Sequence, residues 1–222
     1  MLLLAVDTSG RNGSMALVRV KVGIVEVIEE VALAGGSFSA QLVPQTAALL
    51  EKYGYAKRDL AGFAVASGPG SFTGLRVGLA AIKAMAEILR QPIVAISLLE
   101  AVARSGPAEG RVFSVLDAGR SELYVGDYEL GPPVRMHSER LLSREEFSAE
   151  VKNRIVVTPE SSIAEFARGA GFRVEQVAGP GSGVIARLGW ERIQKEETIS
   201  PEALEANYIR RTDAEIFSKP KP

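Results

Sequence analysis

The stretch from residue 66 to residue 90 restricts the fold more than any other part of the chain, because three local patterns meet in it. The apolar run at residues 62–66, which leads into this stretch, is typical of a buried strand. A turn rich in glycine follows, and the sequence then continues to Arg90 without a helix breaker. We therefore predict a strand, a glycine-rich turn and a helix at residues 74–90 that form one unit.

The turn carries the densest run of small residues in this unit. Three glycines ahead of a helix can present backbone N–H groups to a phosphate. Their spacing, Gly68-x-Gly70-x-x-x-Gly74, matches neither the dinucleotide-binding fingerprint nor the phosphate loop. The pattern favours a tight structural turn, with a phosphate nest as the alternative. We define this signature turn as Gly68, Pro69, Gly70, Ser71, Phe72, Thr73, Gly74 and Arg76.

The predicted helix at residues 74–90 has two apolar faces. At about 100° per residue, one face holds Leu75, Leu79, Ile82, Ala86 and Leu89. The nearly opposite face holds Val77, Ala81, Ala84 and Ile88. A helix that lies on its own sheet needs only one apolar face. We therefore predict that the second face packs against another element or another protein.

The first half of the chain predicts three strands followed by alternating helices and strands. Strands are expected at residues 2–6, 14–20, 23–33, 62–66 and 93–97. Helices are expected at residues 41–53, 74–90 and 98–104. This order implies a mixed sheet with an antiparallel pair at one side and right-handed crossovers elsewhere.

The second half of the chain begins by repeating the predicted order of strands and helices. Each half opens with an apolar strand that ends in an aspartate, Asp7 or Asp117, and continues through a turn containing Gly-Arg into a second strand. Further strands are expected at residues 134–137, 155–158 and 174–178, and helices at residues 144–151, 161–169 and 182–195. We predict a duplicated α/β lobe with a shortened second copy: residues 1–105 form the first lobe, and residues 106–222 form the second lobe and a tail.

Composition excludes several classes of function. The formal net charge of -1 gives the chain no electrostatic reason to bind nucleic acid unaided. The absence of cysteine excludes disulfides, thiolate nucleophiles and zinc–sulfur sites. No apolar run approaches the ~20 residues of a membrane span. Residues 1–6 are too few, and too poor in basic residues, for a secretory signal. We expect a cytoplasmic protein without a membrane partner.

Two facing lobes of this kind resemble the actin, Hsp70 and sugar-kinase architecture, which is built from duplicated ribonuclease H-like lobes. Individual segments narrow the resemblance to the TsaB (YeaZ) family. The most specific of them is the run at residues 68–76, which contains the signature turn. Other similar segments are residues 5–9, 92–98, 117–118, 122–124 and 208–210. The resemblance extends from residue 3 to about residue 211.

The resemblance implies a subunit of the bacterial machinery that makes N6-threonylcarbamoyladenosine (t6A) at adenosine 37 of tRNA. TsaB-like proteins pair with their paralogue TsaD, which carries the metal and transfers the threonylcarbamoyl group, and they engage the ATPase TsaE. They are regarded as non-catalytic, and they self-associate through the surface that they use for TsaD. The resemblance therefore implies a heterodimer with a TsaD-like paralogue, a homodimer in isolation, and contact with tRNA only through the complex.

In this family the partner surface is formed largely by the first two helices of the N-terminal lobe. These correspond to residues 41–53 and 74–90 here. We expect the partner interface to include Leu42, Thr46, Leu49, Tyr53, Val77, Ala81, Ala84 and Ile88. The apolar second face of the helix at residues 74–90 would then have a partner.

The chain lacks the residues that the catalytic paralogue uses. TsaD-like enzymes present two histidines on the first helix as metal ligands, whereas this chain has the single histidine His137, in its second lobe. Many TsaB-like sequences have a histidine where Phe38 stands, so the chain also departs from its own family there. We expect no metal site, no catalytic residue and no turnover by the isolated chain, with His137 at a strand edge or on the surface.

The first hairpin leaves one alternative open. Asp7, Thr8, Ser9 and Gly10 could offer donors to a phosphate, as the equivalent turn does in kinases of this architecture. The pattern favours turns that Asp7 and Asp117 stabilise through Asx hydrogen bonds. We expect no cofactor in the isolated chain, with ATP or ADP restricted to a subunit interface. The alternative function is a nucleotide-binding kinase or hydrolase of small molecules.

Overall fold

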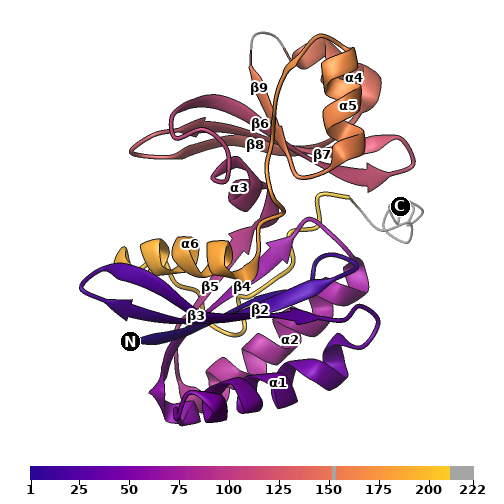
Figure 1. The fold of residues 1–222 in the computed structure, drawn as a ribbon. Coiled ribbons are helices and arrows are strands. Elements are labelled where there is room, and N and C mark those ends of the chain that lie inside the picture. The colour runs from indigo at the N-terminus through magenta and orange to yellow at the C-terminus, as the bar shows by residue number, and fades with distance from the viewer. Residues whose placement is uncertain (152–153, 211–222) are drawn as a thin grey trace, which may run out of the picture.

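The computed structural model describes residues 1–151 and 154–210, which form two five-stranded sheets with helices on both faces (Figure 1). The first half contains five strands, three helices and a short 3-10 turn. The strands are β1 (Leu2–Asp7), β2 (Gly13–Lys21), β3 (Ile24–Leu33), β4 (Leu60–Gly68) and β5 (Ile93–Ser97). The helices are α1 (Phe38–Lys52), α2 (Phe72–Leu89) and α3 (Leu98–Ala103), and the 3-10 turn is η1 (Lys57–Asp59).

The second half repeats the pattern. Its strands are β6 (Gly110–Gly119), β7 (Glu122–Leu130), β8 (Arg135–Ser143), β9 (Ile155–Thr158) and β10 (Arg173–Gln176). Its helices are α4 (Arg144–Glu150), α5 (Ser161–Gly169) and α6 (Ser182–Gln194).

The two sheets have the same topology. The strand order is β3-β2-β1-β4-β5 in one sheet and β8-β7-β6-β9-β10 in the other. In both sheets the first two strands pair antiparallel, and the central strand pairs parallel with its other neighbour. The predicted duplication of a ribonuclease H-like lobe of the actin type is therefore confirmed.

Strand β1 is buried on both faces of the first sheet, which explains why it is a continuous apolar run. Leu2, Leu4 and Val6 belong to the core beneath α1 and α2. Leu3 and Ala5 alternate with them and belong to the core beneath α6. A strand covered on both faces needs apolar side chains at every position, as the sequence of β1 indicates.

The last helix of each half packs on the sheet of the other half. Helix α3 contacts β6 and β7, whereas α6 lies across β1, β2 and β4 (Figure 1). The expectation that residues 182–195 complete the second lobe was therefore wrong, and the lobes predicted at 1–105 and 106–222 exchange their last helices. Residues 211–222, which were assigned to the second lobe and tail, lie outside the described residues.

Several element boundaries differ from the prediction. Helix α1 begins at Phe38 rather than residue 41, because the Phe38 ring is buried and the Gln41 side chain pairs with the backbone N–H and C=O of Ala34. Strand β8 continues to Ser143 rather than residue 137, along its antiparallel pairing with β7. Helix α2 begins two residues earlier than predicted, at Phe72. Among the described residues, no helix combines the length and apolarity of a membrane span.

Candidate functional site

The signature turn joins β4 to α2 and packs against the first hairpin. Its Gly68–Pro69 peptide bond is cis, and Gly68 has a φ of 119°, which favours glycine. Ser71 caps α2 by accepting a hydrogen bond from the Gly74 N–H at 3.3 Å. The Ser71 N–H donates to the Ser9 carbonyl at 2.6 Å. The turn is thus held by its own cap and by the hairpin next to it.

The glycines of this region are explained by close packing. A Cβ atom at Gly70 would lie 2.4 Å from the Ser9 carbonyl oxygen, and one at Gly74 would lie 2.1 Å from the Thr8 carbonyl oxygen. A Cβ atom at Gly78, one turn later, would lie 2.2 Å from Thr8 Oγ1. The Thr8 hydroxyl donates to the Gly74 carbonyl at 2.7 Å in a buried position. These contacts agree with the structural reading of the turn.

The aspartates of the two hairpins form the predicted Asx turns. Asp7 Oδ1 accepts from the Ser9 N–H at 2.8 Å, and Asp117 Oδ1 accepts from the Gly119 N–H at 2.9 Å. Burial raises the pKa of Asp7 above its ordinary value, while the hydrogen bonds from Ser9 oppose that rise. Both carboxylates therefore stabilise their own turns.

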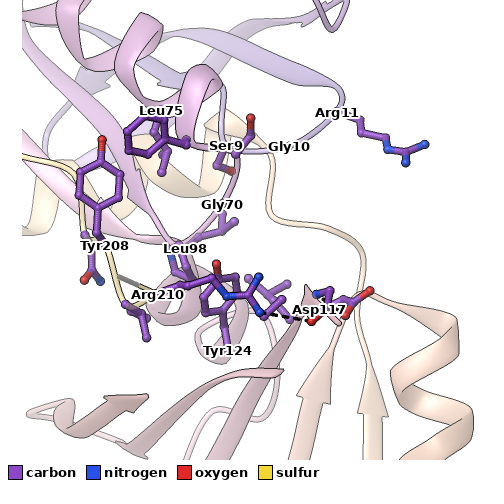
Figure 2. Close-up of a pocket in the computed structure, with 18 of the residues that line it drawn as sticks. Ser9, Gly10, Arg11, Gly70, Leu75, Leu98, Asp117, Tyr124, Tyr208 and Arg210 are labelled. Atoms are coloured by element: carbon purple, nitrogen blue, oxygen red, sulfur yellow. Dashed lines mark hydrogen bonds between the residues drawn. The ribbon is translucent and has the colours of Figure 1, made fainter. Parts of the chain in front are cut away.

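An interlobe pocket of about 670 Å³ opens between these two hairpins. Figure 2 shows Arg210 beside Tyr124 near the Asp117 turn, while Arg11 extends outward. Of the four residues predicted to bind phosphate, only Ser9 and Gly10 line this pocket. Its other walls are Arg11, Pro69, Gly70, Ser71, Phe72, Leu75, Leu98, Leu116, Asp117, Ala118, Gly119, Arg120, Tyr124, Glu160, Asn207, Tyr208, Ile209 and Arg210.

Charges of both signs surround the interlobe pocket. Arg210 is paired with Glu122 and donates to the Gly119 carbonyl at 3.3 Å. Glu160 accepts from the Asp117 N–H at 3.0 Å, and burial raises the pKa of its carboxyl. Burial also raises the pKa of the Tyr124 hydroxyl. The pocket can offer hydrogen bonds and an apolar floor, and both arginines and carboxylates line it.

The N-terminus of α6 carries an internal anion. A helix N-terminus attracts negative charge through its free N–H groups. Here Glu30 from β3 fills that position, accepting from the Ser182 and Gly183 N–H groups at 3.0 Å each. Ser14 adds a hydrogen bond to the Ser182 N–H at 3.0 Å. This helix end therefore holds a carboxylate of the chain itself.

A second concave region, the helical groove, runs between α1 and α2 on the outer side of the first lobe. Its volume is about 580 Å³. Val43 on α1 is 57% exposed, and Ile88 at the far end of α2 is 79% exposed. The groove is lined by Ser39, Leu42, Val43, Phe72, Thr73, Arg76, Val77, Ala80 and Ala81.

The structure divides the predicted interface residues into two sets. Leu42, Thr46 and Leu49 are buried in the core of the first lobe, and the Thr46 hydroxyl donates to the Leu42 carbonyl. Thr46 and Leu49 lie outside the helical groove, so the expectation that they form a contact surface is corrected, because α1 turns them toward its own sheet. Leu42 is also buried, but it lines the groove. Ala84, Ile88 and Tyr53 are exposed, whereas Val77 and Ala81 are half-buried.

Several residues of these surfaces have no signal in the sequence. Val43 and Ala80 line the helical groove, but helical periodicity alone does not say which apolar residues face solvent. Tyr208 packs on Phe72 with ring centroids 5.2 Å apart, a contact across the chain that no local pattern predicts. His137 is exposed on β8, as predicted. Among residues 1–151 and 154–210, no three side chains of the metal-binding types lie close enough to hold an ion.

Comparisons with known proteins place the chain in a family. The model of the family described as "TsaD: tRNA N6-adenosine threonylcarbamoyltransferase" matches residues 28–142, which is just over half of the chain. The "tRNA threonylcarbamoyladenosine biosynthesis protein TsaB" of Haemophilus influenzae is 30% identical over 78% of this chain and 70% of that protein. The Bacillus subtilis protein of the same name is 36% identical over 58% of this chain, and the aligned part spans only 56% of that relative.

A solved structure agrees with these sequence matches. "YeaZ from Pseudomonas aeruginosa" superposes with a TM-score of 0.73 at 25% identity, covering 93% of this chain and all of that chain. At this coverage the likeness in fold extends over both lobes. With the signature turn in the same chain, these matches show that the protein belongs to the TsaB (YeaZ) family.

Proposed function

We propose that the chain is a non-catalytic subunit of the bacterial t6A machinery and that it docks a TsaD-family transferase in the helical groove. The observation that carries the proposal is the exposed apolar groove between α1 and α2, in a chain of this family. Relatives of the chain are named as threonylcarbamoyladenosine biosynthesis proteins, which supports the pathway. Exposed Val43 and Ile88 are the kind of apolar surface that a partner covers.

The match with the TsaD family supports this choice of partner. The matched residues 28–142 include both α1 and α2, so a transferase of that family carries equivalent helices. Two similar faces can pair about a two-fold or near two-fold axis. The same face would then form a homodimer in isolation, and that homodimer would compete with the heterodimer.

The internal contacts of the first hairpin support a subunit without chemistry of its own. The Thr8 hydroxyl is committed to the Gly74 carbonyl, and Asp7 is committed to its own turn. Glu30 already fills the anion position at the start of α6. These groups serve the fold, and the chain contributes binding surface to a partner that supplies the catalysis.

The remaining elements of the proposal concern the assembled complex. The transferase bound to the helical groove would create a composite surface for a TsaE-like ATPase, with ATP or ADP held at a subunit interface. Contact with tRNA would come through the complex, because the net charge of the chain is only -1. The chain would act in the cytoplasm, where tRNA is modified.

A single substitution tests the docking face. Ala84→Arg places a charge on the exposed side of α2, where a bound partner would bury it at a cost of about 3–5 kcal/mol. Ala149→Arg is the matched control, because Ala149 is an exposed alanine in helix α4 of the second lobe. We expect Ala84→Arg to remain folded but to lose both the homodimer and the transferase in size-exclusion chromatography and calorimetry. Normal binding by Ala84→Arg would refute the assignment of the face.

The interlobe pocket supports a second candidate, a small-molecule kinase or hydrolase. Arg210 and Tyr124 could contact a nucleotide in its 670 Å³. Calorimetric titration of the isolated chain with Mg-ATP separates the two functions. Micromolar affinity would favour the enzyme, whereas no heat would favour the subunit.

A further inference from the structure

The last described segment of the chain, residues 207–210, connects the two lobes, and we name it the strap. The Asn207 backbone N–H donates to the Ser67 carbonyl of β4, at 2.7 Å. The Asn207 side-chain amide donates to Glu139 Oε2 of β8, at 2.6 Å. Arg210 is anchored on the second lobe by Glu122 and the Gly119 carbonyl. The strap is therefore tied to both sheets within four residues.

Between its two anchors, the strap packs on the first turn of α2. The Tyr208 ring lies 5.2 Å from the Phe72 ring, and the Tyr208 hydroxyl accepts from Arg76 Nε at 3.1 Å. The Arg76 guanidinium in turn lies 3.6 Å from the centre of the Phe72 ring. Phe72 and Arg76 line the helical groove, and Phe72 and Tyr208 line the interlobe pocket. One cluster of three side chains thus forms part of both concave regions.

Glu139 is the point where the strap meets the lobe junction. Its carboxylate accepts from Asn207, from the Tyr128 hydroxyl of its own lobe, and from the Ser97 hydroxyl at the end of β5. A relative movement of the lobes would separate Glu139 from Ser97 and would pull Asn207 away from Ser67 or from Glu139. Either outcome shifts Tyr208, and with it the Phe72 and Arg76 side chains of the groove.

We propose that the strap couples the helical groove to the arrangement of the two lobes, so that the affinity for the transferase depends on contacts of the second lobe. The inference rests on the proposed docking of the transferase in the groove. By linkage, a bound transferase would in turn favour the lobe arrangement in which the strap is closed. The contacts made by Asn207, Tyr208 and Glu139 position the groove residues.

The test breaks the strap without touching the groove. Asn207→Asp keeps the backbone N–H bonded to Ser67 but sets a carboxylate against Glu139, at a position where the amide now donates. Gln91→Glu is the matched control, because it adds the same charge at a half-buried position outside both pockets and the strap. Tyr208→Phe is the milder variant, which removes only the hydroxyl that accepts from Arg76.

Two measurements are made on each variant. Calorimetry with the transferase should show affinity reduced about tenfold for Asn207→Asp, within the usual range of coupling between sites, and reduced less for Tyr208→Phe. Hydrogen exchange of the isolated chain should show faster exchange at residues 72–80 for Asn207→Asp than for Gln91→Glu, with no change in β6 and β7. A merely structural strap would instead raise exchange throughout both lobes or leave the groove unchanged.

The outcomes separate this inference from the docking proposal. If the wild-type chain does not bind the transferase, the proposed function fails, and the exchange at residues 72–80 still decides whether the strap and groove are coupled. If the wild-type chain binds and Ala84→Arg does not, while both strap variants bind as tightly as Gln91→Glu, the coupling is overturned and the docking stands. Reduced affinity of Asn207→Asp for the transferase, together with faster hydrogen exchange at residues 72–80, supports the coupling. Should Asn207→Asp not fold, Tyr208→Phe provides the same comparison.

Discussion

The contact between Thr8 and Gly78 predicts a substitution whose effect on stability changes sign with its background. A Cβ atom at Gly78 would lie 2.2 Å from Thr8 Oγ1, and Thr8 is only 1% exposed, so neither side has room to move. Such overpacking costs about 1–3 kcal/mol. Replacing a glycine inside a helix by alanine otherwise gains about 1 kcal/mol. Gly78→Ala should therefore lower the free energy of unfolding by about 1 kcal/mol in the wild-type chain.

Removing the Thr8 side chain beyond Cβ should remove the steric clash with a methyl group at residue 78. Thr8→Ala eliminates the hydroxyl that donates to the Gly74 carbonyl and should itself cost about 2 kcal/mol. The atom that then faces the new methyl group is the residue 8 Cβ, at 3.4 Å, which borders on ordinary contact. In the Thr8→Ala background we expect Gly78→Ala to raise the free energy of unfolding by about 1 kcal/mol, because only the gain in helix propensity remains.

Urea unfolding followed by circular dichroism measures all four chains of this cycle. The account predicts an interaction energy of about 2 kcal/mol between the two positions, with similar slopes for all four transitions. Equal effects of Gly78→Ala in the two backgrounds would refute the close approach. The glycines of α2 would then need another explanation, such as a ligand at the backbone.

Two further predictions concern carboxylates of the fold. Glu30→Ala should lower the free energy of unfolding by about 1–2 kcal/mol, because it removes the carboxylate that accepts from the N-terminal N–H groups of α6. In urea titrations at matched ionic strength, sulfate should stabilise this variant more than the wild type. For Asp127, burial raises the pKa, but the hydrogen bond from Arg111 and the charges of Arg154 and Arg111 outweigh burial and lower it. Its contribution to stability is therefore present above the unfolded pKa of about 3.9 and is lost as the pH falls through the lower folded value. Asp127→Asn should lower the free energy of unfolding at pH 7 by about 1–3 kcal/mol, a range already discounted for the partial exposure of both arginines. The unfolding curves of the variant and the wild type should converge in strong acid. A difference that stays constant with pH would contradict this pairing.

Local patterns in the sequence were sufficient to predict most of the helices and strands. Strands β5 and β9 and helix α5 have the predicted bounds, because each is a short periodic run between clear breakers. The repeated order of an apolar strand, an aspartate (Asp7 or Asp117), a turn containing Gly-Arg and a second strand predicted the duplicated lobes. The structural reading of the signature turn followed from its glycine spacing, and the contacts with Thr8 and Ser9 now explain it.

Other features depend on contacts that a local pattern cannot contain. Periodicity shows that α6 is amphipathic, but it does not say which of two sheets the helix covers. The same limit explains the correction at Thr46 and Leu49, because helical periodicity does not show which side of α1 faces the sheet. The packing of Tyr208 on Phe72 joins residues far apart in the chain and has no local signal.

The most direct test of the docking claim uses the absence of cysteine from the chain. Ala84→Cys introduces a single thiol on the exposed face of α2, and Ala149→Cys introduces one on α4 as a control. The rate of maleimide labelling is measured for each with and without saturating TsaD-family transferase. The account predicts that the transferase suppresses labelling at residue 84 and leaves residue 149 unaffected. Labelling of residue 84 at its free rate in the bound chain would contradict the claim.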